Sequence, residues 1–246
     1  MPIDLNLPEK TGLFITGTDA GTGKTLITGC IAKILVGKGL KVGVFKPIAA
    51  GCRRQWEGLV SSETEFLANC ANSDLPLSTI TPIGYLTDAA PLVCAALEAN
   101  PVDFDKIAAA YEDISKVSDV IIVEGIGGVR TPLTMEFDIL DLAVEFALPV
   151  VIVTHPSSNM INHTLMTIDC VRAAELKIAG VVINGYDATK TTIADDTAQQ
   201  VITQCTGINI LSVVPFDETV DIEEPNLGQF TIDSLAECDW TKLARI

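Results

Sequence analysis

The chain has 246 residues, of which 48% are hydrophobic and 20% are charged. This composition supplies a sizeable core and excludes a disordered protein. The 32 acidic residues against 16 basic ones give a net charge of −16, the wrong sign for collecting nucleic acid or anionic lipid. No run approaches the roughly 20 apolar residues that cross a bilayer, and no apolar leader opens the chain. We therefore expect a cytoplasmic protein with no nucleic acid and no membrane among its partners.

Six short apolar runs rich in β-branched residues predict strands buried on both faces, as in a parallel sheet. They lie at residues 13–16, 42–45, 120–123, 150–154, 181–184 and 210–214. The segments between them, such as 26–35 and 165–174, carry apolar residues at helical spacing. The alternation predicts an α/β fold with a doubly wound, mostly parallel sheet in one domain, residues 1–246. Functional residues should then follow the strands.

Two segments depart from this alternation. Residues 76–91 are interpreted as an irregular connection, and residues 216–239, which hold eight acids and no basic residue, as a solvated acidic covering. The seven cysteines are scattered without C-x-x-C spacing, and the chain has only two histidines. We interpret the cysteines as small buried side chains and expect no structural zinc.

The first predicted strand leads into a glycine-rich loop, residues 17–25, and then into a helix. Such a loop turns its N–H groups around phosphate oxygens, as in P-loop NTPases. We expect Lys24 to reach the outer phosphates and Thr25 to hold a magnesium ion. A plain turn that caps a helix would leave the Lys-Thr pair after Gly23 unexplained. The loop is a variant, because one residue more than the strict spacing separates Gly17 from Gly23.

Lys46 ends the second predicted strand, and Pro47 after it cannot continue a central strand. Its ammonium group would face the phosphate loop, stabilising a transferring phosphoryl group or orienting an anionic nucleophile. Alone, the pattern is more typical of a surface lysine; the neighbouring loop reverses that preference. Because Lys24 and Lys46 should project into a cleft, we expect their replacement to suppress turnover with little loss of stability.

Carboxylates near the predicted loop are candidate metal ligands. Glu124 ends the strand at 120–123 and precedes a glycine-rich stretch, a place that suits a metal bridging phosphate oxygens. The alternative is a solvated glutamate at a strand end. Glu63 is a candidate second ligand, and equally a first-turn acid of a helix. Asn184, after another strand, can present its amide to a base, although its pattern alone does not decide this.

Together these motifs resemble the ATP-dependent dethiobiotin synthetases of biotin biosynthesis, and the similarity covers nearly the whole chain. It rests on Gly17-Thr18-Asp19 with Gly23-Lys24-Thr25, Phe45-Lys46-Pro47-Ile48-Ala49, Val123-Glu124-Gly125-Ile126-Gly127-Gly128, Thr131-Pro132-Leu133, Leu148-Pro149-Val150, Ile161-Asn162-His163-Thr164-Leu165, Ala179-Gly180-Val181-Val182-Ile183-Asn184 and Val214-Pro215.

The resemblance implies a homodimeric ligase that uses ATP, Mg2+ and CO2 to close the ureido ring on 7,8-diaminononanoate (7,8-diaminopelargonate). It makes Lys24 and Lys46 catalytic and gives Mg2+ to Thr25, Glu63 and Glu124. The implied nucleotide contacts are Gly21, Thr22, Gly23, Lys24, Thr25, Leu26, Glu124, Gly125, Gly127, Asn184, Gly185 and Pro215. The implied substrate contacts are Thr18, Lys46, Ala50, Met160, Ile161 and Asn162, the last three serving the neighbouring subunit through an exposed helix N-terminus.

The chain departs from the family pattern mainly around the substrate. Residues 20–22, Ala-Gly-Thr, stand where better-known members have threonine, an acid and valine, and residues 157–160, Ser-Ser-Asn-Met, replace Lys-Leu-Gly-Cys. Ala50 replaces a serine and Glu63 an aspartate. Loss of the serine hydroxyl removes at most a hydrogen bond worth ~0.5–1.5 kcal/mol. The nucleotide chemistry is thus better supported than the identity of the acceptor.

Two other classes share such an ATPase core. A partition-type switch ATPase, acting through nucleotide-controlled dimerisation, usually has a lysine near the start of the loop, where this chain has Asp19 and Ala20. It commonly also has a basic or amphipathic surface, which the charge of −16 opposes. An amidating synthase needs a glutaminase domain, for which the chain has no room. His163, in a helix expected to begin near Asn159, is interpreted as packed or capping rather than catalytic.

Overall fold

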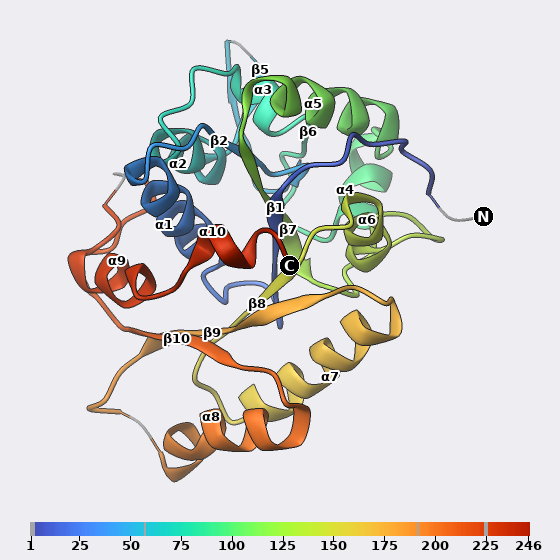
Figure 1. The fold of residues 1–246 in the computed structure, drawn as a ribbon. Coiled ribbons are helices and arrows are strands. Elements are labelled where there is room, and N and C mark those ends of the chain that lie inside the picture. The colour runs from blue at the N-terminus through green and yellow to red at the C-terminus, as the bar shows by residue number, and fades with distance from the viewer. Residues whose placement is uncertain (1–2, 57, 191, 224–225) are drawn as a thin grey trace.

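A six-stranded parallel sheet forms the centre of the computed structural model, which describes residues 3–56, 58–190, 192–223 and 226–246. Its strand order is β10-β9-β8-β1-β7-β2 (Figure 1). The strands are β1 (Gly12–Gly17), β2 (Val42–Phe45), β7 (Val120–Gly128), β8 (Val150–Thr154), β9 (Ile178–Tyr186) and β10 (Ile210–Pro215). All six predicted strands and the predicted α/β class are confirmed.

Alternate residues of each strand enter two separate hydrophobic cores, one on each face of the sheet. In β1, Leu13 and Ile15 face one core and Phe14 faces the other. Because both faces are covered, these strands read as continuous apolar runs rather than as alternating ones. This is why the sequence predicted them well.

Helices cover both faces of the sheet (Figure 1). Helices on one face are α1 (Lys24–Gly37), α2 (Ser62–Cys70), α9 (Gln229–Ala236) and α10 (Trp240–Leu243). Helices on the other are α4 (Pro91–Glu98), α5 (Phe104–Val117), α6 (Ile139–Phe146), α7 (Met160–Ala173) and α8 (Ile193–Thr206). Capping boxes start α6 and α8. No helix in the described ranges is both long and apolar enough to cross a membrane.

The interpretation of residues 76–91 as an irregular connection is wrong in part. This segment contains the short helix α3 (Leu77–Ile80) and the strand β6 (Ile83–Gly84), which pairs with β3 (Ile48–Ala49). A hairpin of β4 (Arg53–Gln55) and β5 (Gly58–Val60) lies between β3 and α2. Elements this short have no period to detect, because long-range pairing alone stabilises them.

The acidic segment 216–239 is more than a covering. Six of its acids are exposed, as predicted, namely Glu218, Asp221, Glu223, Asp233, Glu237 and Asp239, whereas Asp217 is half-buried and Glu224 lies outside the described residues. However, Leu235 of α9 is fully buried in the core beside α1, and the adjoining α10 buries Trp240 there as well. The C-terminal part of the chain therefore contributes to the core.

The two tryptophans provide a test of this packing. Trp240 is fully buried and its indole Nε1 donates a hydrogen bond to the Leu235 carbonyl oxygen at 2.7 Å, whereas Trp56 is 92% exposed. We expect Trp240→Phe to lower the free energy of unfolding by roughly 1–3 kcal/mol, because it removes buried volume and the indole hydrogen bond to the Leu235 carbonyl oxygen. Trp56→Phe should change it by less than about 0.5 kcal/mol. Urea denaturation measures the free energy of unfolding of both variants. Equal losses would contradict the conclusion that Trp240 packs in the core and Trp56 does not.

Candidate active site

The glycine loop connects the carboxyl end of β1 to the start of α1 and needs glycine at its last position. Gly23 has φ +85°, and a Cβ atom there would lie 2.0 Å from Nδ2 of Asn184. That same Asn184 nitrogen donates a hydrogen bond to the Thr22 carbonyl oxygen at 3.1 Å. The amide nitrogen suggested for reading a base therefore binds the loop itself and holds it against the end of β9.

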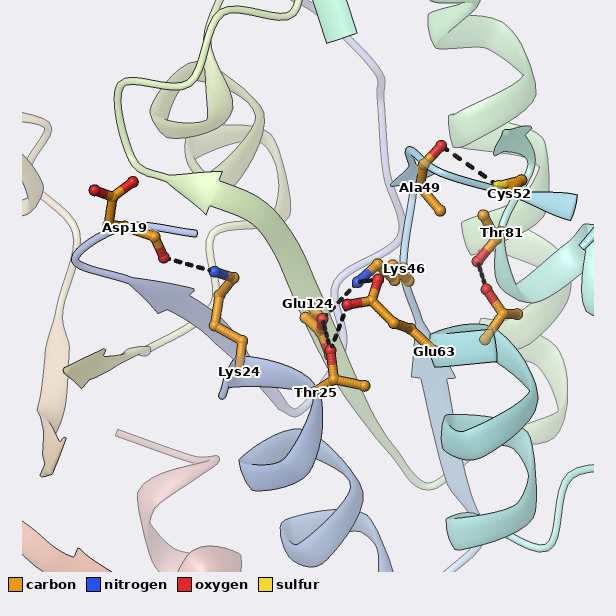
Figure 2. A network of polar contacts seen from close by, with 10 residues as sticks. Asp19, Lys24, Thr25, Lys46, Ala49, Cys52, Glu63, Thr81 and Glu124 are labelled. Carbon is orange, nitrogen blue, oxygen red and sulfur yellow. Dashed lines mark hydrogen bonds and ion pairs between the residues drawn. The ribbon is translucent and has the colours of Figure 1, made fainter. Parts of the chain in front are cut away.

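Lys24 contacts the backbone of its own loop. Its Nζ donates a hydrogen bond to the Asp19 carbonyl oxygen at 2.9 Å, and Figure 2 shows the side chain turned toward that oxygen. Burial lowers the pKa of the Lys24 ammonium below its ordinary value, against the attraction of Glu124. An incoming phosphate oxygen would therefore replace a neutral carbonyl as the partner of this cation.

Four side chains from different elements meet beside the loop (Figure 2). Nζ of Lys46, just after β2, lies 2.7 Å from Oε1 of Glu124 in β7 and 2.5 Å from Oε2 of Glu63 in α2. The Thr25 hydroxyl oxygen at the start of α1 lies 2.8 Å from the same Glu124 oxygen and 3.2 Å from Glu63 Oε1, and either carboxylate can accept its single proton. Lys46, Thr25, Glu63 and Glu124 are called the carboxylate cluster below.

Burial and charge act against each other within the carboxylate cluster. Burial disfavours the charged form of Lys46, but Glu124 and Glu63 outweigh it and raise the pKa of the ammonium. Burial likewise opposes ionisation of Glu63, yet Lys46 and the Thr25 hydroxyl hold its pKa below the ordinary value. Glu124 is fully buried, which excludes the alternative of a solvated glutamate at a strand end. Glu63 satisfies both of its interpretations, since it lies in the first turn of α2 and faces Lys46.

The carboxylate cluster has the chemistry of a magnesium site. Within the described part of the chain, Oε2 of Glu124 is buried and has no hydrogen-bond partner. A hard divalent cation takes such carboxylate and hydroxyl oxygens, and Mg2+ completes its shell with phosphate oxygens and water. Thr25, Glu63 and Glu124 could therefore hold Mg2+ next to the phosphate loop.

A cavity of about 420 Å³ joins the loop to the carboxylate cluster. Lys24 and Lys46 both line it, together with Gly21, Ala50 and Glu63. Gly127, at φ +65°, also lines this cavity, whereas Gly125 is buried between Phe14 and Ile139. The two lysines thus face one space, as the sequence suggested, and Gly125 has a packing environment instead.

Thr18 lies on the other side of the loop. It lines a separate cavity of about 550 Å³ between the end of β7 and α7, which His163 also lines. The Thr18 hydroxyl donates to Oγ1 of Thr154 at 3.3 Å, and Thr164 donates to the same oxygen at 3.2 Å. Thr18 and Lys46 therefore do not line one cavity within a single chain.

The three predicted substrate contacts of α7 stand apart from the lysines. Met160 is buried in the core, Ile161 packs partly against it, and Asn162 is exposed. None of them lines either cavity. The backbone of the first turn and the Asn162 side chain are thus accessible to a ligand from outside.

The predicted base-binding residues lie along the carboxyl ends of β9 and β10. Gly185 lines a cavity with Ser157 and Lys190, and Pro215 pairs with Tyr186. Leu26 lies half-buried in the first turn of α1.

The sequence analysis missed Phe216, whose ring is 55% exposed and whose centroid lies 5.7 Å from Nζ of Lys190. Its position directly after a strand was the available signal, since an exposed ring there can stack on a base.

Comparisons with known proteins match the chain to one family model and to several dethiobiotin synthetases. A family model described as an AAA domain matches residues 11–224. The chain is 34% identical to the ATP-dependent dethiobiotin synthetase BioD of Thermodesulfovibrio yellowstonii, over 91% of this chain and 95% of that protein. It is 33% identical to BioD of Caldicellulosiruptor saccharolyticus, over 86% and 88% of the two chains. It is 32% identical to BioD of Bacillus subtilis, over 83% and 87%.

Solved structures share the fold at lower identity. The MinC:MinD cell division protein complex of Aquifex aeolicus matches with a TM-score of 0.60 and 16% identity, covering 97% of this chain and 94% of that one. The MinD cell division protein of the same organism matches with a TM-score of 0.58 and 15% identity, over 94% and 95%. These likenesses show the fold alone.

The burial of Lys46 corrects the expectation that its replacement would hardly affect stability. Lys46→Met leaves Glu63 and Glu124 facing each other without their cation, which we expect to cost roughly 3 kcal/mol at pH 7. One carboxylate of the variant then binds a proton more tightly when folded. The deficit relative to wild type should therefore shrink as pH falls from 7 to 5. Wild-type Glu63, whose pKa is lowered, loses its contribution only as pH falls below the ordinary value of 4.5.

Lys116→Met is the matched control, because it removes an equal charge from an exposed pair with Glu112 and Asp113. It should change the free energy of unfolding by less than about 0.5 kcal/mol at every pH from 5 to 7. Urea denaturation across this range measures both variants. A Lys46→Met deficit that stays constant or grows on acidification would contradict the pairing.

Proposed function

The chain belongs to the family of ATP-dependent dethiobiotin synthetases, and from this premise we propose that it forms dethiobiotin, ADP and phosphate from 7,8-diaminononanoate, CO2 and ATP. The observation that carries the proposal is the cavity lined by Lys24, Lys46 and Glu63, with Glu124 in contact with Lys46. A carbamate and a terminal phosphoryl group can meet between these two cations. The domain is proposed to be one ATP-binding ligase unit over residues 1–246.

The first step needs an amine, CO2 and a cation. A neutral amine nitrogen attacks the carbon of CO2, forms a C–N bond and releases a proton, and the product is a carbamate anion. Lys46 is the cation at the end of β2 that can bind this anion, because its raised pKa keeps it charged. Its contacts with Glu63 and Glu124 hold the ammonium in place before the substrate arrives.

The second step transfers the phosphoryl group. A carbamate oxygen attacks the γ-phosphorus of ATP and the bond to the β-phosphate oxygen breaks, releasing ADP. Lys24 can exchange the Asp19 carbonyl for the γ-phosphate and neutralise the charge that spreads over its oxygens. The second amine then attacks the carbamoyl carbon, phosphate leaves with the C–O bond electrons, and the amine loses a proton as the ring closes.

Mg2+ would be held by Thr25, Glu63 and Glu124, whose buried and partly unpaired oxygens fit it. When bound, the ion supplies charge neutralisation to the phosphates. Lys46 orients the carboxylate oxygens of Glu63 and Glu124 before any ligand binds. Asn184, through its bond to the Thr22 carbonyl, keeps the loop open to phosphate at the other end.

We also propose a homodimer and a cytoplasmic location. The first turn of α7 is the segment that would serve the neighbouring subunit, since its N-cap residue Asn159 makes no side-chain capping bond and Asn162 is exposed. Free N–H groups at a helix start favour a carboxylate such as that of the diaminononanoate. A sedimentation-equilibrium mass near the 26.1 kDa of a single chain would refute the dimer.

The alternative of a partition-type switch ATPase has only the fold in its favour. The structural match to MinD is at 15% identity and says nothing about activity. The Asp19 backbone carbonyl accepts a hydrogen bond from Lys24, and the acidic side chain of Asp19 offers no cation to a partner subunit. The ligase is therefore the better-supported function.

The direct test mixes purified protein with diaminononanoate, bicarbonate, ATP and Mg2+. We expect a cyclic urea, identified by mass spectrometry, with one ADP and one phosphate per product. ATP hydrolysis that gives no urea and does not respond to the diamine would refute the ligase. If such hydrolysis rose with a protein partner, the switch ATPase would replace it.

Two threonines of α1 form a matched pair for testing the metal site. Thr25→Val removes the hydroxyl that contacts Glu124, and we expect the apparent affinity for Mg2+ to fall roughly 10- to 100-fold. Thr28→Val makes the same change one turn later, where the hydroxyl is buried without a hydrogen bond among the described residues. It should leave turnover unchanged. Turnover measured against Mg2+ concentration distinguishes the two variants. Similar Mg2+ dependences would contradict the assignment of Thr25 as a Mg2+ ligand.

A further inference from the structure

We propose that the Asp88 carboxylate binds the second amino group of the diamine, the one that is not carbamated, and so determines that the site accepts a vicinal diamine rather than a monoamine. This inference rests on the proposed function, because it assigns a residue to the substrate of that reaction. Asp88 lines the cavity that also contains Lys24, Lys46 and Glu63. It belongs to the segment that follows β6, which showed no motif in the sequence.

Glu63 and Glu124 balance the charges of Lys24 and Lys46, which leaves Asp88 as a further carboxylate at the cavity. Lys46 and Lys24 both face it, and a vicinal diamine brings at least one further cation at neutral pH. Glu63 already pairs with Lys46 and accepts a hydrogen bond from Thr25. Because Glu63 and Glu124 are both engaged by Lys46, an ammonium group of the substrate needs another carboxylate as its partner.

Asp88 is a carboxylate in that position. It is exposed, and within the described ranges no hydrogen bond or ion pair engages its oxygens. The nearby acid Glu98 differs, because it accepts a hydrogen bond from the Thr87 backbone N–H at 2.8 Å. Asp88 is therefore available to an ammonium group, and a charge-assisted hydrogen bond to a cation is among the stronger polar contacts.

Backbone pairing places Asp88 against the wall of the cavity. The Tyr85 N–H donates to the Ala49 carbonyl at 2.9 Å, the Cys52 N–H to the Tyr85 carbonyl at 2.8 Å, and the Gly51 N–H to the Thr87 carbonyl at 3.1 Å. Asp88 lies beyond the end of β6, and the hydrogen bond of its neighbour Thr87 to Gly51 ties this segment to the residues that follow β3.

Gly51 brings the backbone close to this carboxylate. It has φ +68°, and a Cβ atom there would lie 3.4 Å from Cβ and 3.7 Å from Oδ1 of Asp88. Ala50 and Gly51 carry no polar side-chain atoms, so Asp88 supplies the charge on this side of the cavity. The carbamate would lie toward Lys46 and the neighbouring ammonium group toward Asp88. This ammonium releases a proton to solvent before its nitrogen attacks the carbamoyl carbon.

The test compares three ligands on wild type, Asp88→Asn and a control variant. Diaminononanoate and the two monoamines, 7-aminononanoate and 8-aminononanoate, are titrated calorimetrically into full-length protein with Mg2+ and a non-hydrolysable ATP analogue. We expect wild type to bind the diamine roughly tenfold more tightly than the monoamine that lacks the Asp88-bound group. Asp88→Asn should bind the diamine roughly tenfold more weakly and discriminate less than about twofold against that monoamine.

Asp74→Asn is the matched control, because Asp74 is exposed between α2 and α3 and does not line the cavity. It should retain wild-type discrimination, and all three proteins should unfold at the same urea concentration. In turnover, Asp88→Asn should raise KM for the diamine about tenfold and leave KM for ATP within about twofold.

The outcomes separate the two proposals. If wild type forms the cyclic urea but Asp88→Asn discriminates as wild type does, the role of Asp88 is refuted and the ligase stands. If wild type forms no cyclic urea, the proposed function fails, and the role of Asp88 fails with it. A loss of ATP affinity in Asp88→Asn equal to its loss of diamine affinity would also overturn the inference, since the residue would then act on the site as a whole.

Discussion

The contact between Lys46 and Glu124 constrains the rest of the site. β2 and β7 are neighbouring parallel strands, and Phe45 pairs with Val123 in their register. The next residue of each strand therefore reaches the same edge of the sheet, where a cation and a carboxylate meet. Both side chains are almost wholly removed from water. Because an unpaired charge is costly at such a place, each of them requires the other.

The phosphate loop is organised around partners that a ligand can replace. Lys24 binds a loop carbonyl, Thr25 binds two carboxylates, and Asn184 binds the Thr22 carbonyl. These bonds hold the polar groups near the positions in which phosphate and a divalent cation would use them. Little reorganisation is then needed when ligands bind, which is the main electrostatic advantage of a preorganised site.

The strands and the phosphate loop could be predicted because their signals are local. A strand buried on both faces is a continuous apolar run, and a glycine loop followed by Lys-Thr is a contiguous motif. The β3–β6 pair and the burial of Trp240 had no such signal, since each depends on a distant surface. Glu63 shows the same limit, because its pattern allowed both a first-turn acid and a cavity ligand, and folding made it both.

Local sequence patterns were thus sufficient to predict the fold class, the start of α1 and the types of residue that bind phosphate. Tertiary structure decided that Lys46 is buried, that Thr18 faces a different cavity, and that Asp88 lines the same cavity as the lysines. The reason is separation in sequence. The contacts of the carboxylate cluster join residues 38, 78 and 99 positions apart, and strand order and register, which no local pattern encodes, bring such residues together.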